Sequence, residues 1–315
     1  MDWQEERRLV KVARMYYEEN MTQNEIAKEL GVYRTTVTRL LQKAKDQKIV
    51  TIHIESALLE YVSIEKELCQ LFGLKDVVIV PSSADSLKEI GKAALRYLDG
   101  IITKDDVVGC AWGRTLGMMA QEAQFQYKRG GRFVPLVGGP GQMPVEEHVN
   151  AIVYSMARAF GGETNFIDAA AIVKSVETQS EILKSGYMTH IRDLWESLSI
   201  ALIGIGSPMK SSNLVWSGFL GKEEVEKLEN QEVVGDVCSR FYDIKGQELA
   251  TDLKERAIAI PFSKLREVKY SIALVESVSK TDSIIGALNG GIANVLITDE
   301  VTARSIIKRK REGIL

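Results

Sequence analysis

The pattern of apolar and polar residues between Met21 and Ala44 predicts two short helices joined by a tight turn. In each half, apolar residues recur at intervals of three and four, which places them on one face of a helix. Gly31 separates the halves, at a position where a left-handed residue ends a helix at little steric cost. The two apolar faces comprise Ile26, Ala27 and Leu30 in the first helix, and Val32, Val37, Leu40 and Leu41 in the second.

Two local features identify this pair as a helix-turn-helix. Thr22 followed by Glu25 forms a capping box, in which each side chain accepts a hydrogen bond from the other residue's backbone amide. Ala27 is small enough to let the helices cross closely before the Gly31 turn. The cap, the turn and both apolar faces therefore predict the same motif.

The segments on either side extend this motif into a small domain. A first helix is expected over 4–19, and the apolar residues of 49–54 predict a strand after the helix pair. A strand at this place is the usual start of a wing. The sequence is compatible with a winged domain and with one that has a single strand.

An amphipathic helix is expected over 58–73, after which the character of the chain changes. We place the domain boundary near Ser56. Residues 1–56 then form the helix-turn-helix domain, and residues 57–315 form a larger C-terminal domain.

From Lys75 onward, short apolar runs alternate with helical stretches. This alternation is typical of an α/β domain with a parallel, Rossmann-like sheet that helices cover on both faces. Residues 206–269 are less regular, and we expect an extra lobe or antiparallel strands there. The predicted strands are Val77–Val80, Val107–Ala111, Phe133–Val137, Ile200–Gly204, Ser271–Glu276 and Asn294–Thr298. The predicted helices are 86–99, 115–126, 146–160, 177–197, 280–289 and 299–311.

Composition and charge narrow the class of protein. The 315 residues are 45% apolar and 26% charged, as in ordinary globular proteins, and a net charge of −3 argues against nonspecific coating of nucleic acid. Residues 21–50 nevertheless hold six basic and three acidic residues, a local net charge of +3. Without the turn motif, this excess would be interpreted as a solvated helix face.

Cysteine and histidine usage argues against a structural metal site or a disulfide scaffold. The three cysteines lie far apart without a CxxC pair, and the three histidines do not cluster with them. The N-terminus lacks an apolar signal region, and no apolar run reaches spanning length. We therefore expect a cytoplasmic protein with no cofactor and no membrane partner.

Candidate ligand sites follow the strands of the predicted sheet, where ligands bind near helix N-termini. Gly113 allows close backbone approach, Thr115 can cap the following helix, and Arg114 can offer a forked cation to a phosphate. Any one of these loops can equally be an ordinary turn that binds no ligand, and Arg240 and Lys280 can be surface charges or members of ion pairs. The four candidate loops are Gly109–Thr115, Gly138–Gly141, Gly204–Ser207, and Lys280 with the later Gly290–Gly291 turn.

Enzymatic motifs are missing from the sequence. No GxGxxG, GxxxxGK[ST], GxSxG or HExxH occurs, and Asp299 and Glu300 are interpreted as helix caps. A sugar-phosphate isomerase or lyase with an added DNA-binding domain is the rival interpretation, with Lys280 as its only nominee, through Schiff-base chemistry. A purely structural assembly protein would leave the Met21–Ala44 motif unexplained.

Taken together, both halves resemble the SorC family of bacterial sugar-responsive transcriptional regulators over essentially the full length. The segments that carry the resemblance are YYEENMTQNEIAKELGVYRTTVTRLLQKA, VGCAWGRT, PLVGGPG, ALIGIGSP, GDVCSRFYD and ALNGGIANVLITDEVTA. The resemblance implies an effector domain related to sugar-phosphate isomerases, a sugar or sugar-phosphate effector, and a homo-oligomer, commonly a tetramer built as a dimer of dimers. Carried over by motif, the effector-binding candidates are Gly113, Arg114, Thr115, Gly138, Gly139, Arg240 and Lys280.

The other implied partner is double-stranded operator DNA. Arg34, near the start of the second helix, suits bidentate contact with guanine, whereas Arg39 and Lys43 are expected to contact phosphates. Many family members begin this helix with Ser, and Tyr33 gives up that cap at a cost on the order of 1 kcal/mol. Repression and activation are both compatible with the sequence. The DNA-binding candidates are Thr22, Gln23, Tyr33, Arg34, Thr35, Thr36, Thr38, Arg39 and Lys43.

Overall fold

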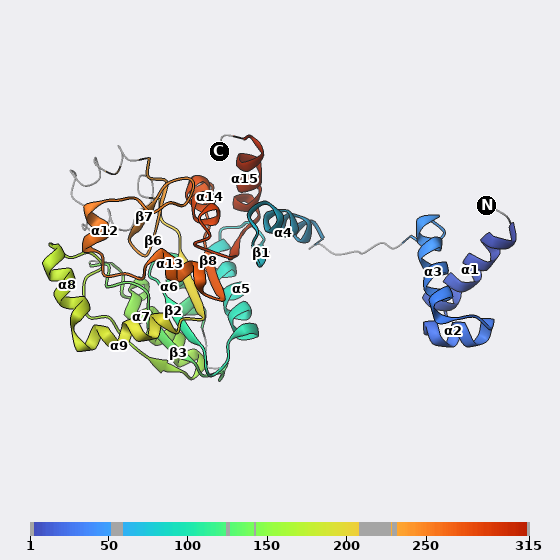
Figure 1. Cartoon of the computed structure of the whole chain (residues 1–315), viewed down its shortest axis with the longest axis horizontal. Helices are drawn as coiled ribbons and strands as arrows, with labels where there is room; N and C mark the ends of the chain where they lie inside the picture. The colour runs from blue at the N-terminus through green and yellow to red at the C-terminus, as the bar shows by residue number, and fades with distance from the viewer. Residues whose placement is uncertain are drawn as a thin grey trace. The chain divides into compact units, whose positions relative to one another are not determined.

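The computed structural model describes residues 3–51, 59–123, 127–141, 143–207, 228 and 232–313. The chain divides into two compact units, Met1–Leu59 and Glu60–Leu315, and Figure 1 labels most of their helices and strands. The predicted boundary near Ser56 lies outside the described residues, as does the predicted strand from Ile52 onward.

The N-terminal unit consists of α1 (Trp3–Tyr17), α2 (Gln23–Leu30) and α3 (Arg34–Asp46), as the apolar pattern predicts. The capping box is present: the Glu25 amide donates to Thr22 Oγ1, and the Thr22 amide donates to Glu25 Oε2. Gly31 adopts the left-handed conformation after α2. After α3 the Ile49 amide donates to the carbonyl of Ala44, so the chain turns there instead of entering the predicted strand at once. The buried core of this unit consists of two clusters, Val12, Met15, Ile26, Ala27, Val37 and Leu41, and Leu9, Ala13 and Ala44.

The C-terminal unit begins with α4 (Leu59–Phe72) and is built on a seven-stranded, wholly parallel sheet. The order β1-β9-β8-β5-β2-β3-β4 places β2, β5 and β8 side by side, although they are far apart in the chain. All six predicted strands are present, and the short β4 was not predicted. The strands are β1 (Asp76–Val80), β2 (Val107–Cys110), β3 (Arg132–Pro135), β4 (Glu163–Thr164), β5 (Ile200–Gly204), β8 (Tyr270–Leu274) and β9 (Val295–Asp299).

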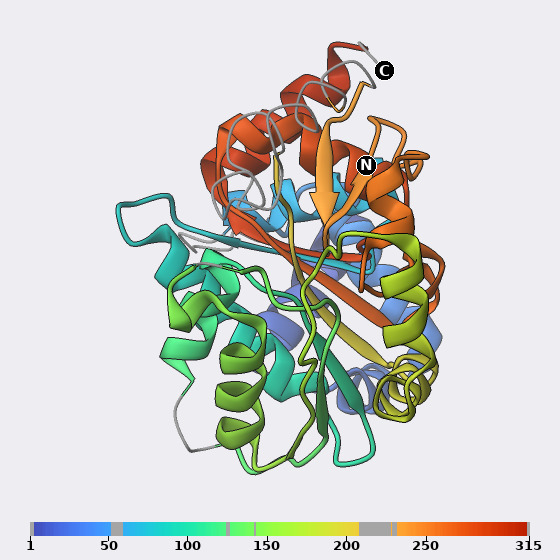
Figure 2. The ribbon, with the colours of Figure 1, turned by 90° about the vertical axis from the view of Figure 1, so that its left-hand side faces the viewer.

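Helices lie on both sides of this sheet, as Figure 2 shows. The predicted helix over 177–197 is wrong as a single element, because Ser185 adopts an extended conformation and starts a new helix by accepting a hydrogen bond from the Met188 amide. The helices are α5 (Ser86–Ile101), α6 (Arg114–Glu122), α7 (Val149–Phe160), α8 (Val176–Lys184), α9 (Gly186–Glu196), α14 (Thr281–Asn289) and α15 (Glu300–Arg311), with 3₁₀ turns η1 (Val145–Glu147) and η2 (Val278–Lys280). None of the described helices is long and apolar enough to cross a membrane.

The irregular stretch after β5 forms the expected extra lobe. It contains the antiparallel hairpin β6 (Gly235–Val237) and β7 (Arg240–Tyr242), followed by α12 (Asp252–Arg256) and α13 (Phe262–Glu267). The two turn residues of the hairpin, Cys238 and Ser239, both have positive φ, as a type I′ turn requires. This tight turn brings the lobe back onto the main sheet.

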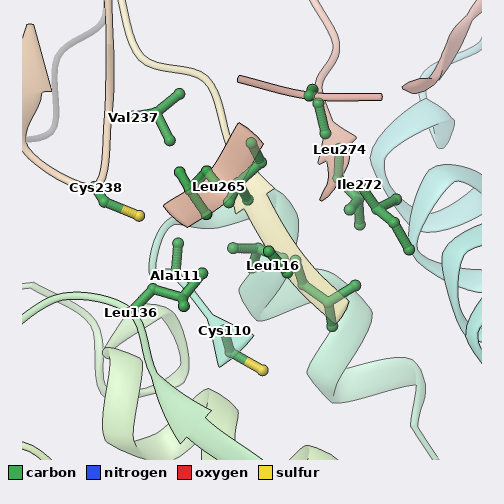
Figure 3. Close-up of a cluster of buried hydrophobic side chains, with 14 of the residues drawn as sticks. Cys110, Ala111, Leu116, Leu136, Val237, Cys238, Leu265, Ile272 and Leu274 are labelled. Carbon is green, nitrogen blue, oxygen red and sulfur yellow. The ribbon is translucent and has the colours of Figure 1, made fainter. Parts of the chain in front are cut away.

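One continuous apolar core joins the lobe to the sheet. Figure 3 shows Val237 and Cys238 of the hairpin in one cluster with Ala111, after β2, and Leu136, after β3. All four residues are at most 5% exposed. The hairpin is therefore held firmly beside the carboxyl edge of the sheet.

Candidate functional site

A cavity of about 430 Å³ opens at the carboxyl edge of the sheet, where β2, β5 and β8 end next to one another. Its walls come from the residues that directly follow these three strands, together with η1 and the β6–β7 hairpin. This position matches the general rule for ligand sites in parallel sheets. The lining residues are Ala111–Leu116, Glu147, Gly204–Gly206, Asp236, Cys238, Glu276, Ser277 and Lys280.

The N-terminus of α6 forms one wall. Gly113 is the N-cap with φ 121° and ψ 171°, a conformation open to glycine but rarely to other residues. The first helical hydrogen bond runs from the Gly117 amide to the Gly113 carbonyl, so the amides of Arg114 and Thr115 precede the helical ladder. Arg114 is exposed beside them. The prediction that Thr115 caps the helix is wrong, because the N-cap lies two residues earlier, at Gly113.

The opposite wall depends on close contact between Gly206 and Asp236. Their backbones form two hydrogen bonds, of 2.9 Å and 3.1 Å. A Cβ atom on Gly206 would lie 2.0 Å from Asp236 Oδ1, so only glycine leaves room for this carboxylate. Asp236 is 7% exposed, and it thus presents a nearly buried carboxyl group to the cavity.

Asp236 and Lys280 are electrostatically coupled. Burial raises the pKa of Asp236 from 3.8 to about 6, while the positive charge of Lys280 and a hydrogen bond from the Ser239 backbone act in the opposite direction. Burial lowers the pKa of Lys280, and the positive charge of Arg114 lowers it further, while the carboxylates of Asp236 and Glu276 partly offset these effects. Lys280 Nζ donates to the carbonyl oxygen of Ile205 at 2.9 Å, which fixes the amine at the end of β5.

Glu147 belongs to the α6 wall. Its backbone carbonyl accepts a hydrogen bond from the Gly113 amide at 3.1 Å. Burial raises the pKa of its carboxyl group, and the charge of Arg114 counteracts this effect. Arg114 therefore has an acidic neighbour, and it is an exposed residue of the cavity lining.

Two further lining residues carry features that are common at functional sites. Ser277, three residues after the end of β8, has φ 133°, a strained conformation for a residue with a side chain. The indole Nε1 of Trp112 is buried without a hydrogen-bond partner among the described residues, whereas Nε1 of Trp195 donates to the Pro135 carbonyl at 2.8 Å. Both deviations lie at the cavity and not in the distant core.

The structure brings together four of the seven predicted effector residues, namely Gly113, Arg114, Thr115 and Lys280. The Gly204–Ser207 loop also reaches the cavity through Gly204 and Gly206, whereas the Gly290–Gly291 turn does not line it.

Three predicted effector residues do not line the cavity. The amides of Gly138 and Gly139 donate to the carbonyls of Ile258 and Ala169, so they are not exposed to an anion. Arg240 is buried, and its guanidinium is bound to Glu248 and to the carbonyls of Ala259 and Ile260. The alternative that Arg240 is a structural ion-pair member is therefore the one that its geometry supports.

Sequence reasoning missed the acidic side of the cavity. Asp236 lies in the segment GDVCSRFYD, which carried the family resemblance but gave no hint that its carboxylate meets the end of β5. Glu147 and Glu276 lie in stretches without a motif. Asp299 does occupy the N-cap position of α15, but its side chain makes no cap, because Oδ2 accepts from Ser82 instead.

The second candidate site is the outer face of α3. Arg34, Thr35, Thr38 and Arg39 are all exposed on this helix, and Tyr33, its N-cap, is 83% exposed. Tyr33 makes no side-chain cap, as predicted. These residues form a polar surface at and beyond the start of α3.

Some of the DNA-binding candidates already have protein partners. Thr38 Oγ1 donates to Gln23 Oε1 at 2.9 Å, which links α3 to the start of α2. Lys43 is half-buried and forms an ion pair with Glu5 of α1. Thr22 is occupied by the capping box, and Thr36 is half-buried. These three residues, Thr22, Gln23 and Lys43, therefore stabilise the helix-turn-helix unit through interactions within the protein, whatever contacts they also make with DNA.

Comparison with known proteins bears on both sites. Residues 56–308 match a family described as "Putative sugar-binding domain". The "Sorbitol operon regulator" of Klebsiella pneumoniae is 37% identical over 308 residues, covering 96% of this chain and 98% of that protein. The "Deoxyribonucleoside regulator" of Bacillus subtilis is 29% identical over 311 residues, covering 98% and 99%.

Solved structures agree with these relatives. The crystal structure of the full-length sorbitol operon regulator SorC from Klebsiella pneumoniae is similar with a TM-score of 0.76 and 37% identity, over 96% of this chain and 98% of that one. Within the family, the sequence motifs resemble the sorbose-operon regulator, whereas the similar proteins named above are regulators of a sorbitol operon and of deoxyribonucleoside genes. The rival enzyme interpretation is not kept, because these relatives are transcriptional regulators. The chain belongs to the SorC family of bacterial transcriptional regulators.

Proposed function

We propose that this protein is a cytoplasmic, DNA-binding regulator of a carbohydrate-utilisation operon, whose operator affinity is set by a sugar or sugar phosphate bound in the cavity. The helix-turn-helix domain, residues 1–56, binds DNA, and residues 57–315 bind the effector and hold the oligomer together. The observation that carries this proposal is the cavity at the carboxyl edge, with the start of α6 in its wall.

The phosphate of the effector binds at the start of α6. Amides that precede the helical ladder point toward an anion, and the helix dipole favours negative charge at this end. Arg114 adds a forked cation beside Thr115, whose hydroxyl is a further donor. The hydroxyl groups of the sugar then lie toward Asp236 and Lys280, which offer an acceptor and a donor.

Operator DNA binds along the outer face of α3. Arg34 and Thr35 lie in its first turn, and in helix-turn-helix proteins the N-terminal residues of this helix contact base edges. Tyr33 stands at the same end with its ring in solvent, where it can contact a phosphate or a thymine methyl group. Arg39 and, after release from Glu5, Lys43 contact phosphates.

The assembly is a homotetramer, a dimer of dimers, as the family resemblance implies. One helix-turn-helix covers few base pairs, so specific binding needs two or more of them. Two such motifs recognise half-sites that lie about 34–36 Å apart or multiples of that distance. The effector changes operator affinity only if it binds the DNA-competent and the incompetent arrangements unequally. The same coupling can produce repression or activation.

Fluorescence anisotropy with the DNA upstream of the gene's own operon tests the proposal. We expect that at least one sugar phosphate from a panel changes operator affinity. In Arg114→Ala, operator binding without effector should be retained and the response lost. Arg129→Ala, which removes an exposed arginine paired with Asp99 away from the cavity, is the matched control and should respond normally. If no sugar or sugar phosphate changes operator affinity, the proposal is wrong.

A further inference from the structure

We infer that the cavity selects its effector by charge: it accepts a sugar with one phosphate and rejects a second phosphate at the other end of the sugar, with Asp236 as the residue that enforces this choice. The inference rests on the proposed function, because it takes the start of α6 as the place of the first phosphate. It adds a rule for which sugar phosphates bind.

The charged residues of the cavity are unevenly distributed. Among the described residues, its lining includes two basic side chains, Arg114 and Lys280, and three acidic ones, Glu147, Asp236 and Glu276. Arg114 stands at the start of α6 together with the amides that precede the helical ladder. The side formed by β6 and the end of β8 carries Asp236 and Glu276, which face a single amine. A phosphate is therefore favoured on one side and opposed on the other.

Asp236 cannot turn away from an incoming anion. It lies in β6, where both its backbone amide and its backbone carbonyl form hydrogen bonds with Gly206. Its carboxylate rests against the Cα atom of Gly206, where no Cβ atom would fit. The Ser239 backbone donates a hydrogen bond to it. With 7% exposure, the carboxylate is also poorly screened by water, so its repulsion of a second negative group is strong.

Lys280 does not compensate for this repulsion. Its amine is held by the Ile205 carbonyl at 2.9 Å and already interacts with the charges of Asp236 and Glu276. The charges of these two carboxylates and of Arg114 thus already act on the amine before any ligand arrives. Neutral hydroxyl groups, by contrast, can donate to Asp236 and accept from Lys280 without adding charge. The arrangement fits the hydroxylated end of a sugar monophosphate.

Isothermal titration calorimetry on the full chain tests this inference, with matched pairs of ligands: glucose 6-phosphate against glucose 1,6-bisphosphate, and fructose 6-phosphate against fructose 1,6-bisphosphate. We expect the wild type to bind the monophosphate of at least one pair at least tenfold more tightly than its bisphosphate. Asp236→Asn should reduce that preference at least tenfold, mainly by tighter binding of the bisphosphate. Asp252→Asn, on α12 outside the cavity, should leave the preference unchanged.

Glu276→Gln provides a second variant in case Asp236→Asn does not fold, which circular dichroism will show. It should also reduce the preference, because it removes the other carboxylate on the same side. Equal affinity of the wild type for a monophosphate and its bisphosphate would overturn the charge rule and leave the proposed function intact. An unchanged preference in both folded variants would do the same. Binding of neither member of any pair would instead contradict the phosphate site itself, and the inference with it.

Discussion

The contact between Gly206 and Asp236 is the feature on which the cavity wall depends, and Gly206→Ala tests it. The new methyl carbon would lie 2.0 Å from Oδ1 and 2.9 Å from Cγ of Asp236. Either the carboxylate leaves its position or β6 separates from the end of β5. Gly204→Ala is a matched control in the same loop, because its methyl carbon would meet only the Trp112 carbonyl oxygen, at an ordinary 3.8 Å.

The magnitude follows from what the methyl group displaces. If β6 separates from the end of β5, two backbone hydrogen bonds are lost, each contributing about 1 kcal/mol. If the segments stay together, overpacking of the closed site costs about 1–3 kcal/mol. Replacing glycine by alanine also stabilises the protein by about 0.4–1 kcal/mol through the unfolded chain, equally in both variants. Gly206→Ala should therefore be about 2 kcal/mol less stable than Gly204→Ala. For a domain of this size, that difference lowers the melting temperature by about 4–8 °C.

Thermal unfolding followed by circular dichroism measures the difference, and calorimetric titration with the effector measures its consequence. We expect effector binding to be weakened strongly in Gly206→Ala, because Asp236 no longer faces Lys280. It should be weakened less in Gly204→Ala, which adds a methyl group to the cavity wall but leaves Asp236 in place. Equal melting temperatures and equal effector affinities in the two variants would refute the assigned role of the Gly206–Asp236 contact.

Three further predictions separate the DNA-binding helix from the cavity. Arg34→Ala should cost about 1–3 kcal/mol of operator affinity, mainly at one base pair, whereas Lys43→Ala should weaken binding to operator and random DNA alike. Anisotropy titrations on both DNAs measure these losses. Equal losses on operator and random DNA for Arg34→Ala would contradict the assignment of Arg34 to a base contact. Tyr33→Ser should add an N-cap that stabilises the N-terminal unit by about 1 kcal/mol while weakening operator binding, and a variant with unchanged operator affinity would remove Tyr33 from the DNA surface. Burial raises the pKa of Asp236 from 3.8 to about 6, so the stability gained by its protonation is present below pH 4 and lost as the pH rises through 6. Asp236→Asn should lack this loss, so its free energy of unfolding in urea should rise by on the order of 3 kcal/mol relative to the wild type between pH 4 and pH 7. Parallel pH profiles of the two proteins would contradict the raised pKa of a buried Asp236 carboxyl group.

Much of the N-terminal unit could be predicted because its determinants are close together in the chain. The capping box joins Thr22 to Glu25, and Gly31 ends α2 by its own backbone conformation. Apolar spacing then identified the core that the structure contains. Contacts between elements were different: the ion pair of Lys43 with Glu5 spans 38 positions, and no local pattern announces it.

The parallel sheet could also be predicted, strand by strand, since buried strands are short apolar runs. The sequence alone further placed glycine-rich loops at the ends of these strands. It predicted that a helix begins after the Gly109–Thr115 loop, although it put the cap at Thr115 and the structure has it at Gly113. It could not rank the loops, because a Gly-Gly pair such as Gly138–Gly139 looks equally available until its amides are found bound to Ile258 and Ala169.

The tertiary structure alone decided which side chains meet in the cavity. The strand order places β2, β5 and β8 side by side, although β2 begins at residue 107 and β8 ends at residue 274. The β6–β7 hairpin folds back so that Asp236 reaches Gly206 and Lys280. The same lobe buries Arg240 against Glu248. Local propensity determines which residues form helices and strands, whereas the burial and the partner of a charge depend on which distant elements the core brings together. For this reason the sequence identified the cationic side of the cavity, and only the fold revealed the acidic side.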